Sequence, residues 1–287
     1  MLLRINLILL AAFALSMFAI SLVVTSMLQE NATREVLAQA GLMLDSAAAI
    51  RSYTETEVGP LLADKMVSTF PPQSVPFYAA TQNFLKLHQE HPDYAYKEAT
   101  LNPTNPRDRA TDWEADIVER FRNDATTREV SGVRDTPMGR SLFMARPIRV
   151  EPGCLGCHSL PSAAPATMLA RYGSDHGFGW QPNEIVGAQI VSVPLADAES
   201  SAGRVRRSVL LTIAAMFAGV LLVINAALHV LVIRPLRAIV RIADQVSLGD
   251  ATAAEFPRGG GREVAALAVA FNRMRKSLDK ALRMLGN

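Results

Sequence analysis

Two cysteines and one histidine stand close together near the middle of the chain. The 287 residues contain only these two cysteines, Cys154 and Cys157, and His158 directly follows the second. A Cys-x-x-Cys-His arrangement fits three kinds of chemistry: a redox dithiol, a zinc site or the covalent attachment of a haem. Each kind of chemistry places different demands on the surrounding residues.

The surroundings of the motif favour the haem. A thioredoxin-like dithiol opens a helix after a strand, whereas prolines on both sides of this motif predict a loop. A structural zinc ion needs four protein ligands, and the chain has no third cysteine. Covalent attachment uses all three residues: Cys154 and Cys157 form thioethers, and His158 supplies an axial imidazole to the iron. The sequence therefore predicts one covalent haem c, with His158 as the proximal ligand.

The second axial ligand is left open by the sequence. His88 and His91 rank first because they come just before a predicted strand, and the position could also be vacant. The other candidates are His176, Met66, Met144 and Met168. Arginines near the motif could pair with haem propionates, although a solvated strand face is their commoner role; they are Arg140, Arg146 and Arg149. We find no acid–base constellation in the sequence, so we do not expect an enzyme.

Two long uncharged stretches frame the motif. They run from Ile5 to Gln29 and from Ser208 to Ile233, and about 25 helical residues cover roughly 37 Å, enough to cross a bilayer. The first stretch is too long for the apolar region of a signal peptide, so we expect an uncleaved anchor. The predicted division is 1–29 first membrane helix, 30–207 loop domain, 208–233 second membrane helix and 234–287 tail. The net charge of +2 gives no reason to expect nucleic-acid binding.

The loop domain reads as a mixture of helices and strands, so the predicted fold class is α+β. We expect the first membrane helix to continue outward along an apolar heptad stripe, Val36 to Ile50. Further helices are predicted at Phe77–Gln89 and over "TDWEADIVERF", which Thr111 or Asp112 would cap. Strands are predicted at Tyr94–Thr100, Ser141–Val150 and Glu184–Leu195, and the Cys-x-x-Cys-His motif connects the last two.

Three segments of this domain resemble the periplasmic c-type haem sensor domains of bacteria, which have a PAS-like antiparallel sheet with flanking helices. The segments are "HPDYAYKEATLNPTNP", "FMARPIRVEPGCLGCHSLPSAAP" and "GWQPNEIVGAQIVSVPL", and the resemblance covers roughly Gly41 to Leu195. It implies that Cys154 and Cys157 carry the haem, that His158 is its proximal ligand, and that the domain senses redox state or small ligands. A cysteine is the second axial ligand in some such domains. That ligand cannot be transferred here, because the chain has no third cysteine.

The tail contains two apolar seams with the spacing of coiled coils. The first seam is Leu236, Ile239, Ala243 and Val246, and the second is Val264, Leu267, Phe271, Met274, Leu278, Ala281 and Leu285. With Pro235 after the membrane stretch, a helix end at Gly249-Asp250 and Glu263 opening the second helix, the tail resembles a HAMP domain. HAMP domains form parallel four-helix bundles from two chains, so the resemblance implies a homodimer through the tail and the membrane helices.

These observations together predict a membrane-bound haem sensor. Haem attachment of this type takes place outside the bacterial cytoplasm. We therefore expect a periplasmic domain, two spans in the inner membrane and both termini in the cytoplasm, in agreement with Arg4 before the first span. Because two residues follow Leu285, we expect a redox or small-ligand signal to pass through the tail to a separate cytoplasmic partner. The alternative is a membrane-anchored monohaem c-type cytochrome for periplasmic electron transfer.

Overall fold

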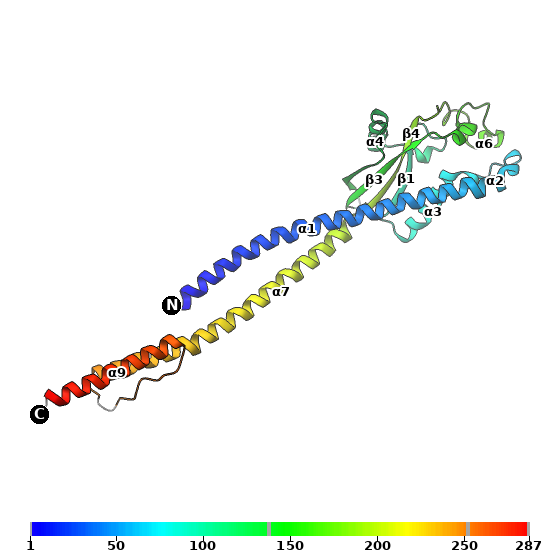
Figure 1. Cartoon of the computed structure of the whole chain (residues 1–287). Helices are drawn as coiled ribbons and strands as arrows, with labels where there is room; N and C mark the ends of the chain where they lie inside the picture. The colour runs from blue at the N-terminus through cyan, green and yellow to red at the C-terminus, as the bar shows by residue number, and fades with distance from the viewer. Residues whose placement is uncertain (1, 137–138, 251–252, 286–287) are drawn as a thin grey trace. The chain divides into compact units, whose positions relative to one another are not determined.

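The computed structural model describes residues 2–136, 139–250 and 253–285, which form two compact units. One unit is Val23–Arg206, and the other combines Met1–Leu22 with Arg207–Asn287. A single helix, α1 (Leu2–Tyr53), contributes residues to both units (Figure 1). The predicted outward helix is therefore part of α1, and no break in the helix marks the division that the sequence predicted at residue 29.

The Val23–Arg206 unit contains a sheet of four antiparallel strands in the order β1-β4-β3-β2. The strands are β1 (Ala95–Thr100), β2 (Val130–Thr136), β3 (Gly139–Arg149) and β4 (Ile185–Pro194). Sequence reasoning predicted β1, β3 and β4 but missed β2. The missed strand lies at the edge of the sheet and contains Gly132 and Asp135, two residue types that are uncommon in strands.

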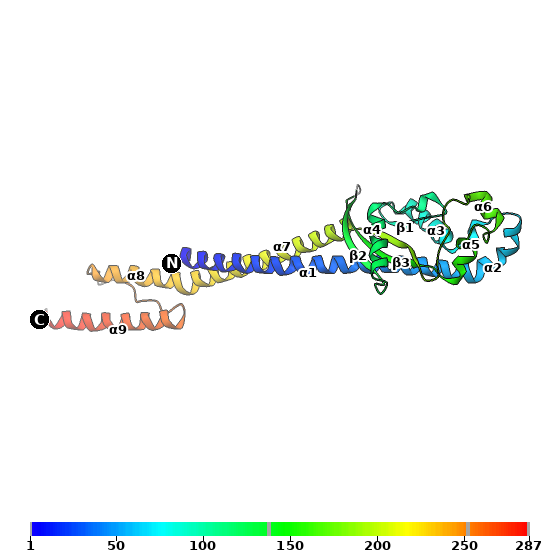
Figure 2. The same cartoon turned by 90° about the horizontal axis from the view of Figure 1, so that it is seen from above.

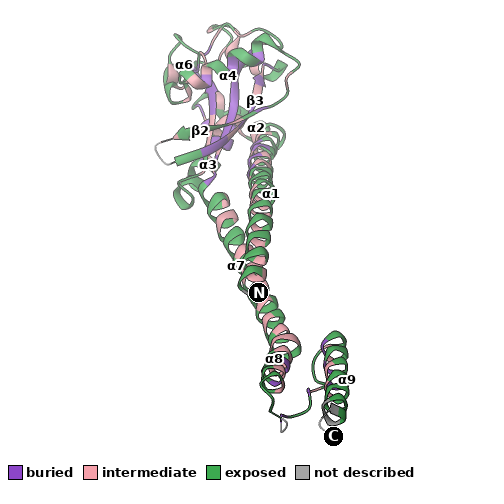
Figure 3. Cartoon of the chain, turned by 90° about the vertical axis from the view of Figure 1, so that its left-hand side faces the viewer, coloured by how far each residue is buried: buried purple, intermediate pink, exposed green. Residues whose placement is uncertain are grey.

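Helices cover both faces of this sheet. They are α3 (Pro76–Glu90) and α4 (Asp112–Asn123), together with the second half of α1. Short helical segments complete the unit: η1 (Thr54–Val58), α2 (Gly59–Leu62), η2 (Ala63–Val67), η3 (Pro72–Ser74), η4 (Pro106–Asp108), η5 (Pro152–Cys154), α5 (Leu155–His158) and α6 (Ala166–Tyr172). α4 lies on one side of the sheet, and α1 and α3 lie on the other (Figures 1 and 2). Figure 3 shows the buried residues concentrated in the strands and on the helix faces against them.

Alternation along the strands produces one apolar cluster on each face. In β4, Ala188 and Ile190 pack with Phe121 of α4. Val191 and Val193, which point to the other face, pack with α1 residues that include Val36, Ala40 and Leu44. The predicted heptad stripe of α1 is therefore buried, at least in part, against its own domain.

The start of α4 illustrates how the sequence fixes a boundary. Thr111 is the N-cap of the helix, and the Glu114 carboxylate accepts the Thr111 backbone N–H at 2.8 Å in a capping box. Lys97 of β1 donates to the same carboxylate at 2.6 Å. Because the cap and the ion pair share one buried carboxylate, α4 is tied to the sheet at its first turn.

The other unit contains the first turns of α1, then α7 (Ala196–Leu228) from Arg207 on, η6 (His229–Ile233), α8 (Arg234–Ser247) and α9 (Arg262–Leu285). α1 and α7 belong to helices long and apolar enough to cross a membrane, with mean hydropathies of 2.8 and 2.5 over their most apolar windows. The Asn6 and Asn225 amides donate to each other at 2.9 and 3.0 Å. Phe13 stacks on Phe217 with ring centroids 3.8 Å apart. Asn225, a polar residue inside a membrane stretch, therefore pairs with a second helix.

α8 and α9 pack through part of the two predicted seams. The buried cluster includes Ile239 and Val264 from those seams, with Phe256 from the connection between the helices. Gly249 ends α8 as predicted, with φ at +83°. The side chain of Leu285, the last predicted seam residue, lies outside the described residues.

Candidate cofactor site

The cysteine motif lies at the start of a short helix that follows a strand. β3 ends at Arg149, Pro152–Cys154 forms a 3₁₀ turn, and Leu155–His158 forms one turn of α-helix. The prediction of a loop was therefore wrong, because proline is well tolerated at the first position of a helical turn. The local structure of the motif therefore does not exclude a redox dithiol.

The thiols themselves give an independent reason against a redox dithiol. Cys154 and Cys157 are half-buried, and burial together with the neighbouring Cys154 raises the pKa of the Cys157 thiol. Reactive dithiols have lowered pKa values, because the thiolate is the nucleophile. Within the part of the chain that the structure describes, no group of three His, Cys, Asp or Glu side chains is arranged to hold a metal ion.

His158 is held in the orientation of a metal-binding imidazole. Its Nδ1 lies 2.7 Å from the carbonyl oxygen of Gly177, and its ring stacks on Trp180 with centroids 4.0 Å apart and planes inclined by 12°. Burial lowers the pKa of His158, which favours the neutral ring. A neutral ring that donates from Nδ1 to a carbonyl leaves the Nε2 lone pair for a metal, with the tautomer and ring direction already fixed.

Gly177 can hold this carbonyl in place only as glycine. Its φ is +84°, and a Cβ at this position would overlap Thr104. The Thr104 hydroxyl oxygen also lies 3.5 Å from His158 Nδ1. Thr104 belongs to the predicted turn "NPTNP", so this turn and the Gly177 loop meet at the imidazole.

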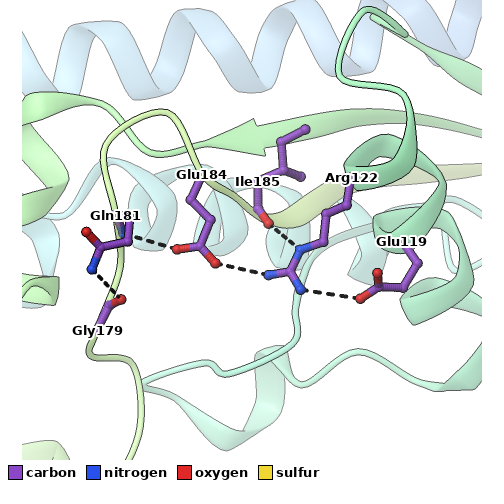
Figure 4. Close-up of polar contacts among 6 residues, drawn as sticks. All are labelled: Glu119, Arg122, Gly179, Gln181, Glu184 and Ile185. Carbon is purple, nitrogen blue, oxygen red and sulfur yellow. Dashed lines mark hydrogen bonds and ion pairs between the residues drawn. The ribbon is translucent and has the colours of Figure 1, made fainter.

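A polar cluster fastens the loop that carries Trp180 (Figure 4). Arg122 of α4 donates from Nε to the carbonyl oxygen of Ile185 at 2.8 Å and from Nη2 to the Glu184 carboxylate at 3.2 Å. The same carboxylate accepts the Gln181 backbone N–H at 3.0 Å. The Trp180 backbone N–H donates to the carbonyl of His158. The stacking ring is therefore positioned through α4 and β4 as well as through His158.

Cys154, Cys157 and His158 line one wall of a cavity of about 370 Å³, within the usual size of cofactor pockets. The other walls come from the end of α1, the η1 to η3 turns, the start of α3, β1, η4 and α6. Aromatic side chains form part of the lining, including Phe70, Phe77, Tyr78, Tyr172 and Trp180. A mostly apolar, aromatic cavity with the thiols and the imidazole on one side suits a flat cofactor bound through that side.

Arg51 places a positively charged guanidinium group in the wall of the cavity. Its Nε is buried and, within the described residues, has no hydrogen-bond partner. Its guanidinium carbon lies 3.8 Å from the centroid of the Phe77 ring, which orients the group. A buried donor without a partner is destabilising unless a ligand completes it. An anionic group, such as a carboxylate of the cofactor, would do so.

The arginines near the motif are engaged elsewhere. Arg140 pairs with Glu199 at 2.8 Å, and Arg146 bridges Asp45 and Glu129 at 2.6 and 3.0 Å. Arg149 donates to the carbonyl oxygens of Asn183 and Ala125. None of the three belongs to the cavity wall. They therefore have structural roles, which is the commoner role that the sequence analysis allowed.

The structure does not bring His88 and His91 together with His158. Both are exposed at the end of α3, where His88 Nδ1 lies 2.8 Å from the carbonyl oxygen of Tyr94, and neither lines the cavity. Ranking them first by their position before a strand is therefore not supported. Among the other candidates, His176 is exposed and Met144 is in the cluster against α1, whereas Met66 and Met168 line the cavity.

Sequence reasoning missed most of the residues that surround His158. Trp180 stands in a quoted segment, but nothing in its spacing to His158 indicates a contact, and Gly177 is one of 17 glycines. The signal for Glu98, which lines the cavity from β1, is a charged residue between Tyr96 and Thr100 on one strand face. That signal alone does not distinguish a buried carboxyl from an exposed one.

The described residues thus form a three-layer α+β domain whose cavity is lined by two thiols and one imidazole. Along the chain, two long apolar helices flank this domain. Residues 29–194 match the model of the Tll0287-like family, and residues 228–280 match that of the HAMP domain. The first match covers more than half of the chain, so the protein belongs to the Tll0287-like family. Both resemblances and the α+β class predicted from the sequence are confirmed.

Two further comparisons complete these findings. A solved structure described as the crystal structure of the cyanobacterial heme-protein Tll0287 is 19% identical, with a TM-score of 0.43. The alignment covers 56% of this chain and 95% of that chain. The search of curated proteins gives no match.

Proposed function

We propose that this protein is a membrane-anchored sensor with one covalent haem c in the cavity of the Val23–Arg206 unit. The observation that carries the proposal is the His158 imidazole, which lies on the same cavity wall as Cys154 and Cys157. Burial favours its neutral form, and Gly177 and Trp180 orient the ring. A relative in the same family is described as a heme-protein. We propose a binding and signalling role rather than an enzymatic one.

The residues of the cavity fit this cofactor in three respects. Cys154 and Cys157 would each form a thioether, and the free Nε2 of His158 would coordinate the iron. Arg51 would donate its buried Nε to a haem carboxylate. A bound haem supplies an iron that changes oxidation state or binds a small ligand. The Gly177 carbonyl, by accepting from Nδ1, increases the basicity of the imidazole as a ligand.

The proposed location follows from this chemistry. Attachment of haem to a Cys-x-x-Cys-His motif takes place outside the bacterial cytoplasm, so the domain would be periplasmic and both termini cytoplasmic. The two candidate membrane helices would then cross the inner membrane on either side of the domain. The positive residue before the first span, Arg4, agrees with a cytoplasmic N-terminus.

The proposed route of the signal follows the chain. β4 ends at Pro194, and α7 begins at Ala196 and leads along the chain to α8 and α9. A change at the cavity that moves β4 would therefore act directly on the start of a membrane helix. The HAMP match supports a homodimer, and we propose that its tail passes this change to a cytoplasmic signalling protein.

A first experiment tests the cofactor. The full chain would be produced with haem-maturation enzymes, purified in detergent and assayed for haem that survives denaturing electrophoresis, with absorption spectra recorded oxidised, reduced and reduced with carbon monoxide. We expect one covalent haem per chain. The C154A/C157A variant should lose it, and the H158G variant should keep the thioethers with an altered spectrum. Wild-type protein without covalent haem would refute the proposal.

A second experiment separates a sensor from an electron carrier. Position 274 lies on a predicted seam and is 59% exposed in the single chain, whereas Lys276 is two residues further round the helix. Single cysteines at the two positions, M274C and K276C, would be treated with a bismaleimide crosslinker in nanodiscs, with the haem oxidised or reduced. A sensor should change the yield of crosslinked dimer at position 274 and lose this change in the C154A/C157A background. If the haem is redox-active but the yield of crosslinked dimer is the same in the oxidised and reduced states, the result would favour an electron carrier.

A further inference from the structure

Glu98 is a buried carboxyl in the wall of the cofactor cavity. Its side chain extends from β1, and the residue is 4% exposed. Glutamate is seldom buried this completely without a cation in contact. Within the described parts of the chain, no ion pair to Glu98 is found. The fold alone therefore does not explain why a carboxyl is buried at this position.

A short chain of hydrogen bonds connects this carboxyl to β4. The Tyr96 hydroxyl donates to Glu98 Oε1 at 2.5 Å, and Gln189 of β4 donates from Nε2 to the Tyr96 hydroxyl oxygen at 3.3 Å. Gln189 is also the residue directly opposite Glu98 in the β1–β4 pairing. Burial and the adjacent Glu98 raise the pKa of the Tyr96 phenol, so the hydroxyl keeps its proton and serves as the donor.

The charged groups that face Glu98 come from two other elements. Arg51 of α1 and Arg107 of η4 favour its ionised form, whereas Asp108 of η4 opposes it. Gln189, from β4, is neutral. Burial outweighs the hydrogen bond from Tyr96 and the two arginines, and it raises the pKa of Glu98 to about 8. The carboxyl therefore exchanges its proton close to neutral pH.

The cavity adds a variable charge to this environment once a haem is bound. An electron that reaches the iron makes the cavity more negative, and in a poorly solvated site this favours protonation of a nearby carboxylate. Four carboxyls line the cavity: Glu98 is buried, Asp108 is partly buried, and Glu55 and Glu151 are exposed. Water screens the exposed two, and Arg107 pairs with Asp108 at 3.2 Å. Glu98 is therefore the group expected to respond.

We propose that Glu98 is a redox-linked proton site: it binds one proton when the haem iron gains one electron. This proposal rests on the proposed function, since it requires a haem in the cavity. The electron comes from an external one-electron donor and converts ferric to ferrous iron. The proton comes from a hydronium ion of the solvent, where one O–H bond breaks and water is left, and it forms one O–H bond on the Glu98 carboxylate. The total charge of the cavity is therefore the same before and after reduction.

Protonation also changes what the carboxyl can do in the hydrogen-bond chain. A carboxylate only accepts, whereas the protonated acid both donates and accepts. Tyr96 and Gln189 would rearrange in response, and Gln189 belongs to the strand that leads into α7. Redox state would in this way reach β4 through hydrogen bonds.

The test is a potentiometric titration of the full-length, haem-loaded protein in detergent between pH 5 and pH 9. If one proton follows each electron, the equilibrium constant of reduction changes up to tenfold per pH unit, about 59 mV for a one-electron couple. The E98Q variant should lose this slope around neutral pH. The E55Q variant, which changes an exposed carboxyl of the same cavity, should behave as wild type.

A second variant keeps the carboxyl and removes its donor. Y96F should move the pH-dependent region to higher pH, because loss of a donor destabilises the carboxylate. A wild-type potential independent of pH, or a slope that persists unchanged in E98Q, would overturn the proton site while leaving the haem intact. Absence of covalent haem in the wild type would instead overturn the proposed function and this proposal with it.

Discussion

The buried carboxyl of Glu98 should make the stability of the haem-free domain depend on pH. In the folded chain its pKa is about 8, against 4.5 for an unburied glutamate. Between these values the folded state binds more protons than the unfolded state. The free energy of unfolding must therefore fall as the pH rises through this window. The E98Q variant keeps the shape of the side chain but has no proton to exchange, so it should lack this contribution.

The size of the effect follows from the same two pKa values. Each pH unit inside the window contributes about 1.4 kcal/mol. The window from 4.5 to about 8 thus corresponds to a loss of roughly 5 kcal/mol in the wild type between its acid and alkaline ends. A loss of this size is comparable to the whole stability of many domains. Below the window Glu98 is neutral in both states and contributes no such loss.

The assay is urea unfolding of the haem-free, full-length chain in detergent at pH 5, 6, 7 and 8. Both tryptophans, Trp113 and Trp180, lie in the Val23–Arg206 unit, so their fluorescence reports on this unit alone. Other titrating groups are common to both proteins, so the quantity of interest is the difference between E98Q and wild type at each pH. That difference should grow steadily in favour of E98Q. A difference that stays constant from pH 5 to pH 8, or one that E55Q reproduces, would refute the reasoning.

Three further predictions concern the surroundings of the site and the tail. W180L removes the ring stacked on His158, so we expect haem to attach but to give a mixed-spin spectrum, with about 0.5–1.5 kcal/mol of lost stacking energy; an unchanged spectrum would contradict the positioning role. F121A empties a fully buried position between α4 and the sheet, and should destabilise the domain by about 3–5 kcal/mol in the same fluorescence assay. N272A leaves the backbone N–H and C=O of Phe256 without their partner, at about 1–3 kcal/mol each. Faster hydrogen exchange around residues 253–275 would verify this, and unchanged exchange would contradict it.

The sequence was sufficient where the signal is local. The Cys-x-x-Cys-His spacing brings three residues of one short segment to one cavity wall, whatever the rest of the chain does. The helix over Asp112–Asn123 was predictable because its capping box and apolar spacing lie within the helix itself. The tail seams were predictable for the same reason, since coiled-coil spacing is a property of consecutive residues.

The sequence was not sufficient where the site is assembled from distant segments. The cavity is lined by Arg51 from α1 and Glu98 from β1, and the His158 imidazole contacts Gly177 from the loop before β4. No rule of sequence spacing relates these three residues. The position of His88 and His91 away from the cavity wall has the same origin, because closeness to a strand in sequence does not determine which face of the domain a side chain occupies. β2 was missed because its pairing with β3, rather than its own composition, makes it a strand.

The free-energy cost of burying the Glu98 carboxyl points to a functional role for this residue. A glutamine at this position would accept the same hydrogen bond from Tyr96 and would carry no charge to bury. Stability alone therefore does not explain a carboxyl here. Sites that break a folding rule are commonly functional ones. Here the exception lies in the wall of the cofactor cavity and is hydrogen-bonded toward the strand that leads into α7. The proposed proton site, linked to the iron of a bound haem, accounts for both the position of the carboxyl and the cost of burying it.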